Sequence, residues 1–176
     1  VAVVSNNSWL GADAVTGIEI AKADWKPVNY GSLDVDYSKL EAFQNSGAIP
    51  IWMNDETVTV ETKVDTSLAI AENTVAEVIE NTPVVKYFTK EFDLSGKVIE
   101  CTINFLANET ANIYLNGQQV AFEEFYFFAP PDSPEVDIDP EYFVSGKNVL
   151  IIEVNSPSQN NGLLVDMKIR TLNQRR

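Results

Sequence analysis

Residues 98–105 read VIECTINF, a run in which apolar and polar side chains alternate. Ile99, Cys101, Ile103 and Phe105 share one face of an extended chain, and the polar side chains share the other. A period of two in a stretch with β-branched residues is typical of a strand that is buried on one face. The run therefore predicts a half-buried strand, with Cys101 as a small core residue.

Similar signals extend to the C-terminal end of the chain. Asn116-Gly117 stands between the runs 111–115 and 118–120. Both residues of this pair accept the positive φ angles of a type I′ turn, so a hairpin is expected, with Asn116 serving the turn rather than a ligand. Further strands are predicted over residues 87–92, 149–154 (as a central strand) and 163–170.

The first half of the chain gives shorter signals. Helical spacing of apolar residues predicts one helix over 65–81, and 37–43 is expected to form a short helical turn. Seven or eight short strands separated by turns favour an all-β fold, an antiparallel β-sandwich that forms a single domain over 1–176 with one or two short helices. The strands expected in this half cover residues 18–20, 49–52 and 58–64.

The composition excludes several classes of function. The chain has 176 residues, no histidine and one cysteine. Ser-His-Asp and Cys-His catalytic groups, the usual zinc sites and an internal disulfide therefore cannot be built from it. Its formal net charge of −14 disfavours binding to nucleic acid and to anionic membrane surfaces. We also expect no membrane insertion, because no apolar run approaches the length of a membrane span.

Six short motifs follow one another along the later part of the chain: AIPIW (48–52), KYFTKEFDL (86–94), GKV (96–98), IYLNG (113–117), VSGKNVLIIEV (144–154) and NGLL (161–164). This order resembles the galactose-binding-like jelly-roll domains, which occur as carbohydrate-binding modules, as accessory domains of bacterial glycosidases and in secreted or phage surface proteins. The resemblance covers residues 48–170 and leaves 1–47 as an N-terminal extension or as the first strands. It implies a jelly-roll topology but no particular ligand.

Aromatic and amide side chains on predicted loops are candidates for a ligand site. Sugar rings stack on exposed aromatic faces, and amide side chains bond the sugar hydroxyls. On this basis we assign ligand binding to Trp25, Tyr126, Asn160 and Asn161.

The other aromatic residues divide between core and surface. Trp52, Phe88 and Tyr114 lie in apolar strands and are assigned to the core. Trp9 has polar neighbours, so both a ligand contact and a core position that seals the sandwich remain open. The dense aromatic stretch 122–131 fits either a binding patch or subunit interface, or a lid over one end of the core.

Acidic residues crowd the segment 132–139. Calcium takes six to eight oxygen ligands, and acidic loops supply them, although no EF-hand pattern is present. We expect no required cofactor, and we assign a structural calcium ion, if one binds, to Asp132 and Asp137.

Two hypotheses of function remain open. The first is a non-catalytic module at an extracellular, cell or virion surface that binds carbohydrate, such as a cell-surface glycan, through loop aromatics. The second is a structural subunit of a phage virion appendage or decoration, or of an extracellular filament, that self-assembles through strand or aromatic-patch contacts. In this second case the apolar residues 1–4 would complete the sheet edge of a neighbour.

We do not expect an enzyme. A glycosidase needs two placed carboxylates, but a chain with 26 acidic residues contains such pairs by chance. The chain is at most an accessory domain of a glycoside hydrolase, and in that case it is a fragment of a longer protein.

Overall fold

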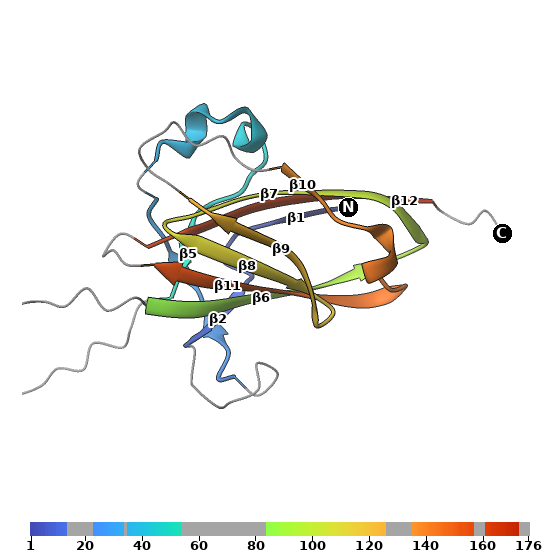
Figure 1. The fold of residues 1–176 in the computed structure, drawn as a ribbon, viewed down its shortest axis with the longest axis horizontal. Coiled ribbons are helices and arrows are strands. Elements are labelled where there is room, and N and C mark those ends of the chain that lie inside the picture. Colours follow the sequence, from blue (N-terminus) through green and yellow to red (C-terminus); the bar gives the residue numbers. More distant parts are fainter. Residues whose placement is uncertain (14–22, 34, 54–83, 126–134, 157–160, 173–176) are drawn as a thin grey trace, which may run out of the picture.

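The computed structural model describes residues 1–13, 23–33, 35–53, 84–125, 135–156 and 161–172. They form two antiparallel sheets that pack face to face (Figure 1), so the predicted antiparallel β-sandwich is confirmed. The helix predicted over 65–81 and the strands predicted over 18–20 and 58–64 lie outside the described residues. Within the described ranges, no helix is both long and apolar enough to cross a bilayer.

In the part of the chain that the structure describes, each sheet contains six strands. The first sheet has the order β10 (Glu135–Asp137), β7 (Lys97–Ala107), β12 (Leu163–Leu172), β5 (Ile51–Trp52) and β4 (Asn29–Tyr30), and β1 (Ala2–Val4) also pairs with β12. The second sheet has the order β3 (Lys26–Pro27), β2 (Leu10–Asp13), β6 (Val84–Leu94), β11 (Gly146–Ser156), β8 (Thr110–Leu115) and β9 (Gln118–Glu124). From β6 onward most connections cross between the sheets, as expected for a jelly-roll.

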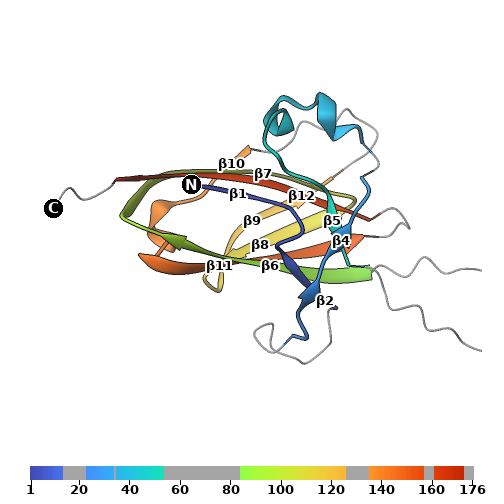
Figure 2. The same cartoon turned by 180° about the vertical axis from the view of Figure 1, so that it is seen from behind.

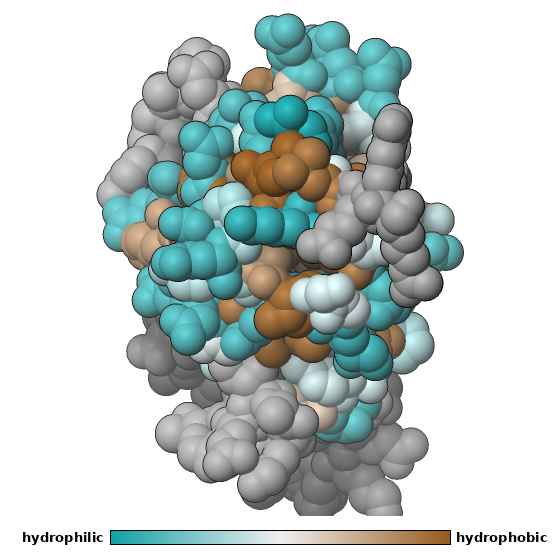
Figure 3. Space-filling view, turned by 90° about the vertical axis from the view of Figure 1, so that its right-hand side faces the viewer, coloured by the Kyte–Doolittle hydropathy of each residue, from teal (hydrophilic) through white to brown (hydrophobic). Residues whose placement is uncertain are grey.

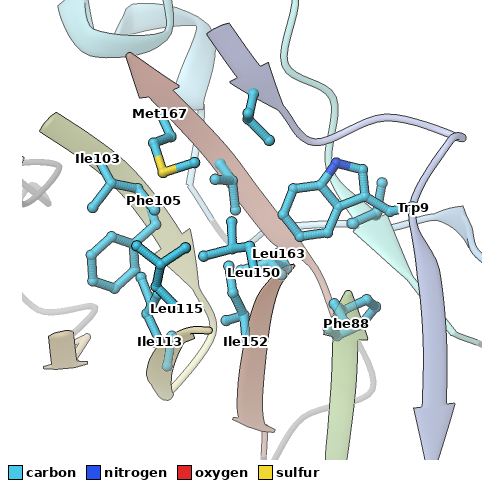
Figure 4. Close-up of a cluster of buried hydrophobic side chains, with 14 of the residues drawn as sticks. Trp9, Phe88, Ile103, Phe105, Ile113, Leu115, Leu150, Ile152, Leu163 and Met167 are labelled. Carbon is cyan, nitrogen blue, oxygen red and sulfur yellow. The ribbon is translucent and has the colours of Figure 1, made fainter. Parts of the chain in front are cut away.

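The core follows from the alternation in the long strands. In β11, Leu150, Ile152 and Val154 are fully buried, whereas the intervening side chains are only partly buried. Figure 4 shows Leu150, Ile152 and the neighbouring Ile113 and Leu115 on one side of this core. Side chains of β7 and β12 in the other sheet complete it, among them Ile103, Phe105, Leu163 and Met167. The strand β11 lies between β6 and β8 and is therefore the central strand that the sequence predicts.

Side-chain hydrogen bonds fix the predicted hairpin. Asn116 and Gly117 have φ angles of 50° and 83°, and they connect β8 to β9 as expected. The Asn116 amide donates to the Tyr142 carbonyl and to Asn148 Oδ1, both at 2.9 Å, and its Oδ1 accepts from Val149 N at 2.9 Å. Asn116 therefore serves the turn, and in doing so it ties the hairpin to the start of β11.

The N-terminal segment belongs to the sandwich of its own chain. Residues Ala2–Val4 pair antiparallel with β12, and the Val1 amino group donates to the Ile169 carbonyl at 2.7 Å. Residues 1–47 thus include the first strands of the fold. Pairing of this segment with a neighbouring molecule, as the structural hypothesis expects, stays a prediction.

A helical segment covers part of the outer face of the first sheet. Its two 3-10 turns are η2 (Tyr37–Lys39) and η3 (Glu41–Phe43), which confirm the predicted helical turn. Phe43 packs with Leu106 of β7 and Leu164 of β12 in a second apolar cluster. Figure 2 shows these turns above β7 and β12 and away from β6 and β11. A further 3-10 turn, η4 (Pro140–Tyr142), lies near β7.

Two assignments from the sequence are resolved by burial. Trp9 is fully buried, and its indole Nε1 donates to the Val4 carbonyl at 2.8 Å, so it is a core residue. The core assignment of Tyr114 is wrong: its neighbours Ile113 and Leu115 point inward, so the alternation of β8 turns Tyr114 to the outer face.

Other core assignments are confirmed. The rings of Trp52 and Phe88 are buried with their centroids 5.4 Å apart. Cys101 is also buried, and burial, with a smaller effect from the Asp137 carboxylate, raises the pKa of its thiol to about 12. This thiol is therefore a core group without a thiolate at neutral pH. Ile99 departs from the core face predicted for it. It is half-buried beside a register irregularity between β7 and β12, and Val98 takes the inward position there.

The exposed surface mixes polar and apolar side chains. Figure 3 shows one end of the sandwich, where apolar groups lie in a central band bordered by hydrophilic ones. The exposed large apolar residues come from several elements and include Leu10 of β2, Tyr30 of β4 and Phe122 of β9. Scattered positions of this kind are usual for a folded surface and do not by themselves mark an interface.

Truncation of Trp9 tests this account of the core. We expect Trp9→Ala to lower the free energy of unfolding by about 3–5 kcal/mol, because it leaves a large cavity and an unpaired Val4 carbonyl. Trp9→Phe keeps an apolar ring and is expected to cost less. Urea unfolding measures both variants, and a loss below about 1 kcal/mol for Trp9→Ala contradicts the assignment of Trp9 to the core.

Candidate functional site

A groove of about 800 Å³ lies on the outer face of the second sheet. This volume is in the range typical of small-molecule sites. The groove is lined by Ser8, Leu10, Trp25, Thr89, Lys90, Glu91, Tyr114, Asn116, Gly117, Val149 and Ile151.

The strand register brings these distant residues together. Leu10 of β2 lies opposite Thr89 of β6, Thr89 lies opposite Ile151 of β11, and Ile151 lies opposite Tyr114 of β8. These four positions form one row across the sheet. With neighbouring strands 4.7–4.9 Å apart, the row spans roughly 14 Å. Glu91 and Val149 face each other in the next row on the same face.

Two aromatic residues come to the groove from different sides of the sheet. Trp25 precedes β3, the strand that borders β2, and its backbone N–H donates to the Ala23 carbonyl at 3.1 Å. Tyr114 comes from β8, on the far side of β11. Both side chains are partly exposed. The strand order thus places an indole and a phenol at separate positions along one groove.

The polar side chains of the groove differ in which hydrogen-bond donors and acceptors remain for a ligand. Both protons of the Asn116 amide are used by the contacts described above, and its Oδ1 already accepts one hydrogen bond. The Tyr114 hydroxyl accepts from Asn112 Nδ2 at 2.7 Å and has no acceptor for its own proton among the described residues. Thr89 Oγ1 donates to the Leu150 carbonyl at 3.0 Å, so it keeps lone pairs rather than a proton.

Two charged residues of β6, Lys90 and Glu91, line the groove next to each other in the sequence. Lys90 Nζ donates to the Ser8 carbonyl at 3.2 Å and also to Ser8 Oγ. Glu91 Oε2 accepts from Lys147 Nζ at 2.8 Å. The hydrogen bond to Glu91 raises the pKa of Lys147, and the charge of Glu91 adds to this effect. The carboxylate of the groove is thus neutralised by a lysine, whereas the partners of the Lys90 ammonium among the described residues are neutral oxygens.

Tyrosines of the outer face remain protonated well beyond neutral pH. Burial raises the pKa of Tyr114, and the nearby Glu153 carboxylate raises it further. Burial likewise raises the pKa of Tyr87, together with its hydrogen bond to Glu153. In the register of the sheet, Glu153 lies opposite Tyr87 of β6. Both phenols therefore keep their protons at physiological pH, and the proton of Tyr87 is donated to Glu153.

The residues assigned to ligand binding from the sequence do not all meet at the groove. Trp25 lines it. Asn161 does not: its Oδ1 accepts from Ser156 Oγ and its backbone carbonyl accepts from Ser32 N at 2.9 Å, so it ties the residues before β12 to the end of β11 and to Ser32. Tyr126 and Asn160 lie outside the described residues.

The proposed calcium site is only partly within the described chain. Asp137 lies exposed on β10, opposite Thr102 of β7, and Asp132 lies outside the described residues. In the part of the chain that the structure describes, no group of three or more His, Cys, Asp or Glu residues could hold a metal ion. Calcium binding at Asp132 and Asp137 therefore stays a prediction.

Sequence reasoning missed most of the groove. Leu10, Tyr114, Val149 and Ile151 look like core residues because they are apolar and lie in strands. The alternation does contain a signal: Tyr114 and Ile151 each stand between two core residues, so their own side chains point to the outer face. However, their proximity follows only from the pairing of four strands.

No protein-family model and no curated protein matches the chain. Among solved structures, the chain matches an α-L-rhamnosidase from Streptomyces avermitilis. The identity is 19%, the match covers 49% of this chain and 9% of that chain, and the TM-score is 0.42. A glycosyl hydrolase family 2 member from Bacteroides cellulosilyticus has 12% identity, 97% and 21% coverage, and a TM-score of 0.49. A PA14 sugar-binding domain from an RTX adhesin has 12% identity, 51% and 46% coverage, and a TM-score of 0.30.

The chain spans only 9% of the rhamnosidase and 21% of the family 2 enzyme. At these identities and scores the similarity assigns neither a family nor a ligand to the chain.

Alkaline titration tests the description of the outer face. Because Glu153 raises the pKa of Tyr87 and Tyr114, we expect Glu153→Gln to shift the titration of both phenols to lower pH. Ultraviolet absorbance of phenolate follows the titration, with Tyr87→Phe and Tyr114→Phe identifying each step.

The same pKa shifts have a consequence for stability. A folded pKa above the unfolded value of 10 contributes stability below that pH, which is lost as the pH rises through the folded pKa. We therefore expect the folded protein to lose stability above pH 10, and to lose less of it in Tyr87→Phe.

The titration of Glu153→Gln has its own contradicting outcome. An unchanged phenol titration in this variant would show that the carboxylate does not act on the two tyrosines.

Proposed function

We propose that the chain is a non-catalytic module that binds carbohydrate in the groove over β2, β6, β11 and β8. The observation that carries this proposal is the placement of Trp25 and Tyr114 at separate points of one groove of about 800 Å³. Their partly exposed rings offer flat apolar surfaces to the faces of sugar rings. The site thus differs from the loop site expected from the sequence, and Trp25 is shared by both.

The polar groups of the groove complement sugar hydroxyls. Tyr114 has a proton to donate, Thr89 has lone pairs to accept, and the Lys90 ammonium has a proton beyond the two that Ser8 engages. A mixture of apolar surface and a few placed polar groups is what a small-molecule site requires. Leu10, Val149 and Ile151 supply the apolar part of the floor.

Binding without catalysis is supported by the acids of the groove. Among the described residues that line it, Glu91 carries the one carboxylate, and Lys147 holds that carboxylate in an ion pair. Glycoside hydrolysis needs two carboxyl groups with distinct roles, one of them a proton donor with a raised pKa. This lining supports recognition of a glycan, and we extend the proposal to a glycan at an extracellular or particle surface.

Aromatic truncation tests the proposal. We expect Trp25→Ala and Tyr114→Ala each to weaken glycan binding about tenfold or more, because each removes a stacking surface and the Tyr114 change also removes a hydroxyl. A glycan microarray identifies a bound glycan, and calorimetric titration measures its affinity for each variant.

Tyr30→Ala is the matched control, since Tyr30 is 77% exposed on β4 of the other sheet. It is expected to leave the affinity unchanged. Full affinity in both groove variants, or equal losses in all three, would place the ligand elsewhere on the molecule.

A further inference from the structure

The Lys90 ammonium differs from the other lysines of the second sheet. Lys147 pairs with Glu91 at 2.8 Å, Lys26 pairs with Asp24 at 3.5 Å, and Lys86 pairs with Asp13. Lys90 contacts no carboxylate in the described part of the chain, and its partners are the carbonyl and the hydroxyl of Ser8.

The composition makes this arrangement unusual. The chain has 26 acidic and 12 basic residues, so acids outnumber bases by more than two to one. A lysine in such a protein readily finds a carboxylate. Here the ammonium is instead held by Ser8, and both Lys90 and Ser8 line the groove. The result is a positive charge held in place by Ser8, with a third proton that has no acceptor among the described residues.

We infer that the groove selects a sugar that carries an anionic group, a carboxylate or a sulfate, and that Lys90 binds this group. The inference rests on the proposed function, since it names the class of carbohydrate that the same groove takes. A hydrogen bond between an ammonium and an anion is stronger than one between neutral groups, and a ligand anion here would supply a counter-charge that no described residue provides.

The negative charge of the whole protein does not outweigh this contact. At physiological ionic strength the Debye length is about 8 Å, so most carboxylates of the surface are screened from the groove. The nearest carboxylate of the groove, Glu91, is neutralised by Lys147. A direct contact with Lys90 therefore dominates the interaction with an anionic sugar.

The test compares charged and uncharged forms of one glycan. A microarray with neutral, uronic-acid-bearing and sulfated oligosaccharides identifies the bound class. Comparison of the uronic-acid-bearing with the sulfated oligosaccharides separates recognition of carboxylate from recognition of sulfate. The best-bound oligosaccharide is then titrated beside its carboxyl-reduced or desulfated form. We expect the charged form to bind about tenfold or more tightly than the uncharged form, and Lys90→Met to remove this difference.

Lys97→Met is the matched control, because it removes one positive charge from the exposed start of β7, outside the groove. We expect it to retain the preference for the charged form. If Lys90→Met and Lys97→Met lose the preference for the charged form equally, the preference depends on net charge alone, and the inference is overturned.

The outcomes also separate the two proposals. Binding of neutral glycans that depends on Trp25 but not on Lys90 overturns the anionic preference and leaves the proposed function standing. Absence of binding to every glycan on the array overturns both.

Discussion

The register between β6, β11 and β8 is the constraint on which the rest of the structure depends. Each strand buries alternate side chains, so a slip of one residue would exchange the core face and the outer face of that strand. The same pairing that buries Leu150 and Ile152 therefore sets Ile151 beside Thr89 and Tyr114 on the groove. At the turn, Asn148 is buried and its amide makes four hydrogen bonds, to Asn116 Nδ2, Val144 N, Val144 O and Gly146 O. This network fixes the start of β11 against the hairpin.

The outer faces of the two sheets differ: a chain segment covers part of the first, and a groove lies on the second. The segment around Phe43 covers Leu106 and Leu164 on the outer side of the first sheet. The second sheet instead carries a groove on its outer side, with an indole, a phenol and an ammonium along its lining. Its apolar residues are part of strands that the core already holds in place. The groove is therefore preorganised, which lowers the entropic cost of binding a ligand.

Local patterns in the sequence predict the strands but not the groove. The alternation in 149–154 and the Asn116-Gly117 pair depend on nearby residues, and both are confirmed. The alternation in 98–105 predicts the strand correctly, but Val98 rather than Ile99 takes the inward position, and Asn104 is buried. The apolar run around Tyr114 predicts a core position for this aromatic residue, but the inward positions of Ile113 and Leu115 turn it outward. The polar neighbours of Trp9 gave no indication of its burial. The groove joins Leu10 to Ile151, and no local pattern contains a contact over that separation.

The most direct test of the central claim is chemical-shift mapping of the backbone amides and of the Trp25 indole during titration with a bound oligosaccharide. The account predicts that the shifts concentrate on the indole of Trp25 and on residues 89–91, 114–117 and 149–151, which neighbour one another only in the folded sheet. Shifts confined to Asn161 and the adjoining connection, with the groove unperturbed, would contradict it and return the site to the rim of the sandwich.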